Sequence, residues 1–319
     1  MGIKGQWVTV ENAVMIWKVM VQSVLDYATE VFVDIERWEG AEVIARKMGK
    51  AILGVRKSTA NEVVMGELGW WSMKGRRDLL RLLYWGEIVS CKEGLRWEVY
   101  KEGRRRGRGW CEYTEKCLRG LKLGKYWDKQ DGWKSDAEMW RGKVARQIQH
   151  REQEEWRGRM QKKSKLRTYR GFKRKLEREN YLLEGTAMQR KVMTMIRGGS
   201  NDLRIETGRW EKLEVEERVC IFCSKGVVED ERHFLCECEA WSEVRDGVIR
   251  RVREVAGEER SIEDIMFVIG GGRVKVGEGR RIRWREIVLQ GVERMDRLRR
   301  KEWKSRMMGV GSRSNGKQS

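Results

Sequence analysis

The chain has 319 residues, a formal net charge of +20 and seven cysteines, four of which lie between positions 220 and 238. This length is enough for one large or two modest domains with a buried core. The excess of Lys and Arg favours a polyanionic partner, with nucleic acid ahead of an anionic membrane surface. An odd, clustered set of cysteines argues against a disulfide framework and indicates a metal, so we expect an intracellular protein of the nucleus or cytoplasm.

The amino-acid usage is unusual in a second way. The chain has no proline, 16 Trp and only two His, whereas a proline share of about 5% would give roughly 16 prolines. Because proline and histidine codons begin with cytosine and the tryptophan codon lacks it, this usage indicates a coding strand depleted of cytosine. Some Trp are therefore expected at former Arg positions, which weakens any argument for base stacking from the number of Trp.

A helical bundle is predicted for residues 1–125. From Val14 to Trp38, apolar residues recur at spacings of three and four, which places them on one face of a core-packing helix. Polar residues interrupt the same stretch, so it fits neither a membrane span nor a signal-peptide core. These residues are Lys18, Gln22, Asp26 and Glu30.

Further helices are expected in the same bundle. One spans 41–53 and ends at Gly54, and the next covers 62–68 with Asn61 as its N-cap. The stretch 76–88 is apolar over a wide arc, as expected of a helix buried among others. The basic, glycine-rich stretch 103–109 predicts a flexible loop, suited equally to phosphate contact and to a solvated linker.

Residues 126–205 are predicted to form a basic helical linker. Fifteen Lys or Arg lie between Arg141 and Arg178, and apolar residues recur among them, which gives long helices with one apolar and one cationic face. The cationic face is the best candidate surface for a nucleic-acid backbone; a solvated surface helix is the alternative. The candidate nucleic-acid-binding side chains are Lys162, Lys163, Lys165, Arg167, Arg170, Lys173, Arg174 and Lys175.

The next predicted module, residues 206–257, contains a candidate metal site. Cys220, Cys223, His233 and Cys238 form a C-x2-C-x9-H-x4-C array, with the ligand types and spacings of structural zinc sites. Four protein ligands leave no open coordination position, so the zinc is expected to stabilise the fold and not to activate water. A shift of two residues would replace Cys238 by Cys236, and this alternative is open from spacing alone.

The surroundings of this array indicate how it is used. Phe222, Phe234 and Leu235 are expected to pack around the metal. Between Glu211 and Glu243 there are ten acidic and four basic residues, so the module is anionic and is not expected to grip phosphates itself.

C-terminal helices are predicted for residues 258–304, where apolar residues again recur at helical spacing within a basic segment, and a disordered tail is predicted for 305–319.

No catalytic arrangement is evident. A catalytic triad would have to use His233, which the metal array claims, and His150 lies in a charged run that predicts a surface position. The expected fold class is therefore mainly α, and the expected protein is not an enzyme.

Several blocks of sequence resemble one family. Gly208-Arg209-Trp210 and the run from Val228 to Leu235 look like the C-terminal region of LINE-type (non-LTR) retrotransposon reverse transcriptases. Upstream, Val24–Tyr27, Ile52–Thr59 and Glu67–Trp70 are similar to the stretch that follows the polymerase palm in the same elements. The family carries Pro after Ser-Thr, where this chain has Ala60.

The resemblance implies a thumb-like helical bundle, a basic linker and a zinc knuckle that together hold template RNA and target DNA. It also implies Cys238 as the last zinc ligand. In the family, polymerisation depends on a Tyr/Phe-Ala-Asp-Asp turn, which this sequence lacks. Three hypotheses follow: a non-catalytic nucleic-acid-binding fragment, a decayed reading frame that folds without binding nucleic acid specifically, and the C-terminal end of a longer enzyme.

Overall fold

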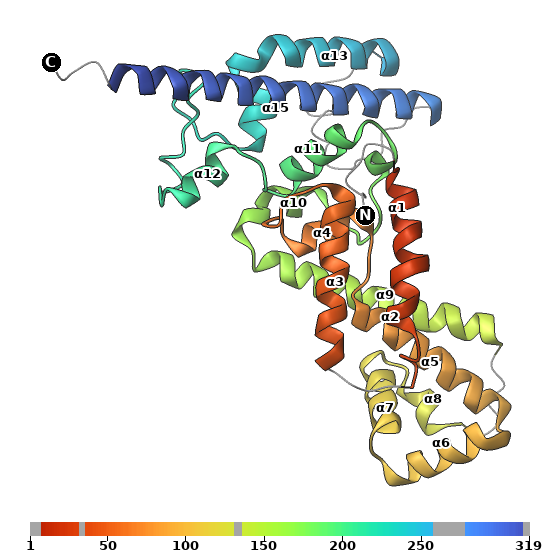
Figure 1. The fold of residues 1–319 in the computed structure, drawn as a ribbon. Helices are drawn as coiled ribbons and strands as arrows, with labels where there is room; N and C mark the ends of the chain where they lie inside the picture. Colours follow the sequence, from red (N-terminus) through yellow and green to blue (C-terminus); the bar gives the residue numbers. More distant parts are fainter. Residues whose placement is uncertain (1–7, 32–35, 131–135, 258–277, 315–319) are drawn as a thin grey trace.

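The computed structural model describes residues 8–31, 36–130, 136–257 and 278–314, which form an almost entirely helical protein (Figure 1). These ranges contain no β-sheet, only isolated β-bridges between Leu68 and Arg178 and between Val219 and Val228. The predicted fold class, mainly α, is confirmed. None of the helices in the described ranges combines the length and apolarity that crossing a bilayer requires.

The N-terminal half begins with a helix that changes from α-helical to π-helical geometry and back. Its elements in chain order are α1 (Val10–Ile16), the π-helical turn η1 (Trp17–Gln22), α2 (Ser23–Asp26), α3 (Glu36–Leu53), α4 (Asn61–Leu68), α5 (Met73–Cys91), α6 (Gly94–Arg106), α7 (Trp110–Gly120) and α8 (Gly124–Asp128).

The second half is dominated by two long helices, α9 and α15. Its elements are α9 (Ala137–Gln161), the 3-10 turn η2 (Ser164–Leu166), α10 (Arg167–Phe172), the 3-10 turn η3 (Asn180–Leu183), α11 (Ala187–Arg197), α12 (Arg204–Trp210), the π-helical turn η4 (His233–Glu237), the 3-10 turn η5 (Glu239–Trp241), α13 (Ser242–Ala256) and α15 (Glu278–Ser314).

The first predicted helix is shorter than expected. Val14 and Trp17 are buried, but after the π-helical turn Val24 is 71% exposed and Val31 is 45% exposed. A π turn holds more residues than an α turn, so it rotates the following apolar positions away from the core. The helix ends at Asp26, and a continuous stripe to Trp38 is therefore wrong.

The next helices follow the predictions more closely. α3 ends at Leu53, and Gly54 adopts a φ of +65°, as expected of a C-terminal glycine cap. The helix α4 starts at Asn61 itself, so Ala60 is the N-cap, one residue earlier than predicted.

The predicted basic loop at 103–109 is mostly helical. α6 continues to Arg106, and only the residues from Gly107 form a turn. Arg105 and Arg106 each pair with Glu102 one turn earlier, at 2.8 and 2.7 Å. These contacts stabilise the last turn of the helix modestly, so the loop prediction is wrong for residues 103–106.

The basic segment is not one continuous helix. α9 ends at Gln161, and the chain then turns back through η2 and α10. The bridge between Arg178 and Leu68 ties the returning chain to the end of α4. The cationic residues predicted to share one helix face are therefore distributed over several surfaces.

The hydrophobic core is divided along α9. The N-terminal half of α9, including Val144, packs with α5–α8, whereas the half around Trp156 packs with α4 and α10. A larger cluster joins α1, α11, the cysteine-rich segment, α13 and α15. In Figure 1, α15 lies along α13 at one end of the molecule and α5–α8 lie at the other. The predicted bundle 1–125 thus contributes to more than one core.

Beyond Ser305 the chain stays helical: α15 runs to Ser314, past the predicted end of the C-terminal helices at 304. Residues 258–277 of the predicted C-terminal helices, and residues 315–319 of the predicted tail, lie outside the described part of the chain.

Several tryptophans are core residues. Trp85 and Trp156 are fully buried, and Trp85 packs against Trp140 and Trp127 at ring-centroid distances of 5.6 and 6.1 Å. Whatever their codon history, these rings fill the interior, in agreement with the apolar arc predicted for 76–88 and the apolar face predicted for the basic linker.

The cysteines outside the array are expected to differ in reactivity. Burial raises the pKa of Cys111 to about 11 and that of Cys117 to about 12, whereas Cys91 is exposed. Because the thiolate is the reactive form, iodoacetamide at neutral pH should modify Cys91 in the folded protein and leave the other two unmodified until denaturant is added. Peptide mass spectrometry checks this; early labelling of Cys117 would contradict the packing of α7.

Candidate metal centre

Cys220 and Cys223 lie on a short hairpin-like loop. The bridge between Val219 and Val228 closes the loop, and the Cys220 backbone N–H donates to the Val227 carbonyl at 2.8 Å. Gly226 has a φ of +62°, a left-handed conformation that favours glycine at the turn. The loop therefore presents two thiols two residues apart from one rigid turn.

His233 and Cys238 come from a π-helical turn. The Cys238 backbone N–H donates to the His233 carbonyl at 2.8 Å, a bond between residues five apart. At the start of this turn, the Asp230 carboxylate accepts a hydrogen bond from the His233 backbone N–H at 2.7 Å. The wide turn explains the four intervening residues, because it returns Cys238 to the side of the helix that carries His233.

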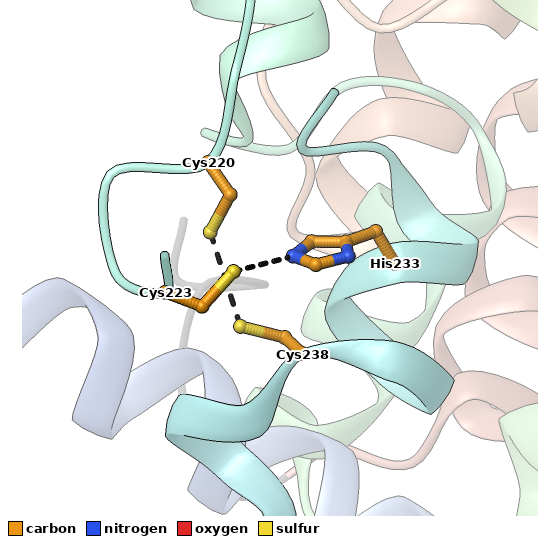
Figure 2. A group of neighbouring side chains, drawn as sticks. All are labelled: Cys220, Cys223, His233 and Cys238. Carbon is orange, nitrogen blue, oxygen red and sulfur yellow. Dashed lines mark hydrogen bonds between the residues drawn. The ribbon is translucent and has the colours of Figure 1, made fainter. Parts of the chain in front are cut away.

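The four side chains converge on one point (Figure 2). Their ligand atoms all lie within 4.8 Å of one another. The Sγ atoms of Cys220 and Cys238 are 3.8 Å apart, and Cys223 Sγ lies 3.5 Å from His233 Nε2. A tetrahedral zinc with bonds of about 2.3 Å to sulfur and about 2.05 Å to nitrogen requires separations of about 3.8 and about 3.5 Å. The group can hold a metal ion, and its geometry fits zinc.

The thiols are electrostatically prepared for a cation. A hydrogen bond from the Cys238 thiol lowers the pKa of Cys220, and the backbone N–H groups of Phe222 and Cys223 act in the same direction. The same bond raises the pKa of Cys238, since the two thiols share one proton. Because metals bind the thiolate form, a metal ion at this point would take the place of the proton that the two thiols share.

Burial distinguishes Cys238 from its neighbour Cys236. Cys238 is completely buried and belongs to the converging group, whereas Cys236 is half-buried and does not. This arrangement favours Cys238 as the fourth ligand, as the family resemblance implied.

The three apolar residues predicted to pack around the metal, Phe222, Phe234 and Leu235, are buried in one cluster with Cys220 and Cys238. Phe222 and Phe234 are buried and contact Trp241 at centroid distances of 5.4 and 6.4 Å. The long C-terminal helix closes the other side, because the Trp303 ring lies 6.4 Å from Phe222.

A buried ion pair ties the same module to α15. Arg299 donates twice to the Glu229 carboxylate, each time at 2.7 Å, and both side chains are almost fully buried. Glu229 also accepts from the backbone N–H of Arg204 at the start of α12, at 2.8 Å. One carboxylate thus joins the cysteine-rich loop to two helices, a role that the sequence analysis did not identify.

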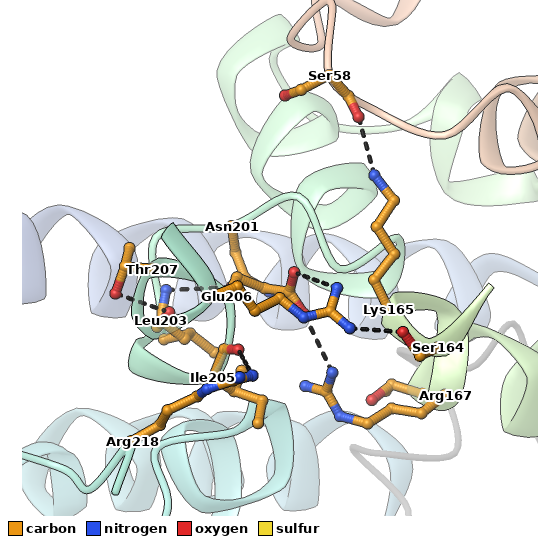
Figure 3. A network of polar contacts seen from close by, with 12 residues as sticks. Ser58, Ser164, Lys165, Arg167, Asn201, Leu203, Ile205, Glu206, Thr207 and Arg218 are labelled. Carbon is orange, nitrogen blue, oxygen red and sulfur yellow. Dashed lines mark hydrogen bonds and ion pairs between the residues drawn. The ribbon is translucent and has the colours of Figure 1, made fainter. Parts of the chain in front are cut away.

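Two predicted nucleic-acid-binding residues are engaged inside the protein. Lys173 is 4% exposed and forms an ion pair with Glu179. Arg167 donates to Glu206 at 3.0 Å and to Glu231 at 2.8 Å, and Figure 3 shows the first of these contacts. Both cations are largely committed to holding α10 against its neighbours.

Other predicted residues face solvent. Lys162, Arg174 and Lys175 are exposed, and within the described ranges no carboxylate pairs with them. Arg170 is half-buried and donates to the Gln161 carbonyl at 3.0 Å. These four side chains are candidates for contact with a polyanion.

The junction of α9 and α10 contributes to a larger group of cations. Lys165 Nζ donates to the Ser58 carbonyl at 2.9 Å (Figure 3). Arg209 of α12 donates to the Ser164 hydroxyl at 2.7 Å. Burial lowers the pKa of Lys165, and although Glu206 opposes the shift, repulsion from Lys163 and Arg209 adds to it.

The helix α3 supplies the other members. Lys50 Nζ donates to the Lys57 carbonyl at 2.8 Å. Burial lowers the pKa of Lys50, and repulsion from Lys165, Lys163 and Arg46 lowers it further. We define the cation cluster as Arg46, Lys50, Lys163, Lys165 and Arg209.

Three carboxylates partly balance the cation cluster. Glu42 lies 3.8 Å from Arg46, Glu62 lies 2.5 Å from Lys163 Nζ, and Glu206 lies 3.5 Å from Arg209. Lys50 and Lys165 bind backbone carbonyls, which satisfy a donor without cancelling the charge. Five cations against three acids leave the cluster positive. Arg46 and Lys50 were not predicted as members of this surface, because they lie about 115 residues from Lys163 and Lys165 along the chain.

His150 is on the surface, as predicted: its side chain is 67% exposed and lies 3.4 Å from Glu154.

In comparisons with protein-family models, curated proteins and solved structures, nothing matched this chain.

Proposed function

We propose that this chain is a non-catalytic nucleic-acid-binding protein with a structural zinc site. The observation that carries the proposal is the cation cluster, where segments far apart in sequence place five cations together. Such an arrangement concentrates positive charge at a cost in mutual repulsion, and a phosphate backbone relieves that repulsion while it releases counterions.

The family part of the proposal rests on the sequence. The blocks around Gly208–Trp210 and Val228–Leu235 support a relation to the C-terminal region of LINE-type reverse transcriptases, and the convergence of the four metal ligands is compatible with the zinc knuckle expected there. In this proposal zinc fastens the cysteine-rich loop to the helices around it, and the cations of α3, of the junction between α9 and α10, and of α12 hold RNA or DNA.

The salt dependence of binding tests the proposal. Fluorescence anisotropy of labelled RNA and DNA oligonucleotides should show log affinity falling linearly with log salt for the wild-type chain. Lys50→Gln/Lys165→Gln should reduce the slope by about 1.4 on single strands or about 1.8 on duplex, since each phosphate contact contributes about 0.7 or 0.9. At 0.1 M salt this corresponds to roughly 25- to 60-fold weaker binding.

A matched control separates local contact from net charge. Lys18→Gln/Lys129→Gln removes the same charge from two exposed lysines away from the cation cluster and should leave the slope nearly unchanged. If the wild-type chain binds neither RNA nor DNA at low salt, the chain is a folded protein without this activity, and the proposal is wrong.

A further inference from the structure

A groove of about 420 Å³ runs between α11 and α15. None of the described residues that line it belongs to the cation cluster, and it has two chemically different walls. The wall on α11 carries Met188, Val192 and Met195, whereas the wall on α15 carries Arg297, Lys301 and Lys304. Each set follows the spacing i, i+4, i+7, so each forms one row along its helix.

The α11 wall is apolar. Val192 and Met195 are buried and form the floor, and Met188 at the end of the row is 53% exposed. An exposed methionine beside a charged row offers a soft and adaptable surface to a flat apolar group. The wall can therefore contact the ring of a base without selecting its sequence.

The α15 wall is cationic. Its three side chains span about 10 Å along the helix axis, at 1.5 Å per residue. Lys301 and Lys304 are exposed, and within the described ranges no carboxylate pairs with either. Lys191 of α11 also lines the groove and likewise has no acidic partner there.

The acids that line the groove already have partners. Asp296 accepts from Arg300 at 2.7 Å, and Glu293 lies 3.3 Å from Arg297. The groove therefore keeps an excess of cations, contributed by its three lysines.

We propose that this groove binds a single-stranded stretch of RNA or DNA, with phosphates along Lys301 and Lys304 and a base against Met188. The inference rests on the proposed function and specifies a second contact surface for it. A single strand exposes base faces next to its phosphates, which matches one apolar and one cationic wall, whereas a duplex buries those faces in its own stack. An acidic peptide would use the lysines and leave the apolar wall empty.

The test measures anisotropy of a labelled single-stranded oligonucleotide and of the matching duplex on the full chain. Lys301→Gln/Lys304→Gln should weaken single-strand binding about 25-fold at 0.1 M salt, since two phosphate contacts contribute about 1.4 to the slope. Met188→Ala should weaken single-strand binding and leave duplex binding unchanged. The control Lys18→Gln/Lys129→Gln should behave as wild type, and circular dichroism should show the same helicity in all variants.

The outcomes separate the two proposals. Absence of any binding by the wild-type chain contradicts the proposed function and, with it, the groove. Two results contradict the groove alone. One is a single-strand affinity that is unchanged in Lys301→Gln/Lys304→Gln, and the other is an equal loss of single-strand and duplex affinity in Met188→Ala. Displacement of the single strand by polyglutamate at equal charge concentration would assign the groove to acidic peptides and overturn the inference.

Discussion

Purified protein is expected to contain about one zinc ion per chain, and Cys238→Ser is expected to lose it. Two pairs of ligand atoms already stand at the separations that a tetrahedral zinc requires, and all four ligand atoms lie within 4.8 Å of one another. Structural zinc contributes on the order of 10 kcal/mol of binding free energy in isolated zinc-finger peptides at neutral pH, so loss of one ligand should also loosen the loop around Cys220. Metal analysis and limited proteolysis measure the two effects.

Cys236→Ser is the matched control, because it removes a neighbouring thiol from the same turn. This variant should keep its zinc and its resistance to protease. The opposite result, with zinc retained in Cys238→Ser and lost in Cys236→Ser, would assign the fourth ligand to Cys236 and require the π-helical turn to rewind. Stoichiometric zinc in both variants would show that neither thiol is essential for binding.

Local sequence was sufficient to predict three of the four side chains that converge, Cys220, Cys223 and His233, whereas the choice of Cys238 over Cys236 depended on the family resemblance. The ligand types and the two short spacings, C-x2-C and H-x4-C, reflect turn geometry. The aromatic residues next to the ligands were expected to be buried because they are apolar. The contribution of α15 could not be foreseen, since Arg299 lies 70 residues from Glu229. Nothing in a helical pattern distinguishes an arginine that will pair inside the core from one that faces water.

The helices were predictable where the apolar residues kept the spacing of a regular α-helix. Two errors arose where local geometry changed the phase or the end of a helix. The π turn after Ile16 rotated Val24 into solvent, and pairing with Glu102 kept Arg105 and Arg106 in α6. Both effects depend on side-chain contacts within one or two turns, which hydrophobic periodicity does not register.

The basic linker shows why charge runs are difficult to interpret from sequence. A run predicts that cations are abundant, but the fold decides which of them reach solvent. Lys173 is buried against Glu179, whereas Lys50, from a helix outside the basic linker, joins Lys163 and Lys165 in the cation cluster. Surface charge is a property of the tertiary arrangement, so it appears only when distant segments are placed together.

Arg299→Met is expected to destabilise the protein by about 3–5 kcal/mol, as is typical when one partner of a buried ion pair is removed. The variant leaves the Glu229 carboxylate buried with the Arg204 N–H as its remaining partner among those identified above. It also removes the guanidinium from above the Phe222 ring, 5.1 Å away. Urea denaturation measures the loss, and zinc release to a colorimetric chelator should become faster because the loop is no longer held against α15.

Two further variants identify the cause. Arg297→Met lies on the same helix but changes an exposed pair with Glu293, so it should cost at most about 1 kcal/mol. Arg299→Met/Glu229→Gln should recover part of the stability lost in Arg299→Met, since a buried amide costs less than an unpaired buried charge and still accepts from Arg204. If the double variant is no more stable than Arg299→Met, the loss comes from packing around Phe222, and the ion pair is not what fastens the metal centre to α15.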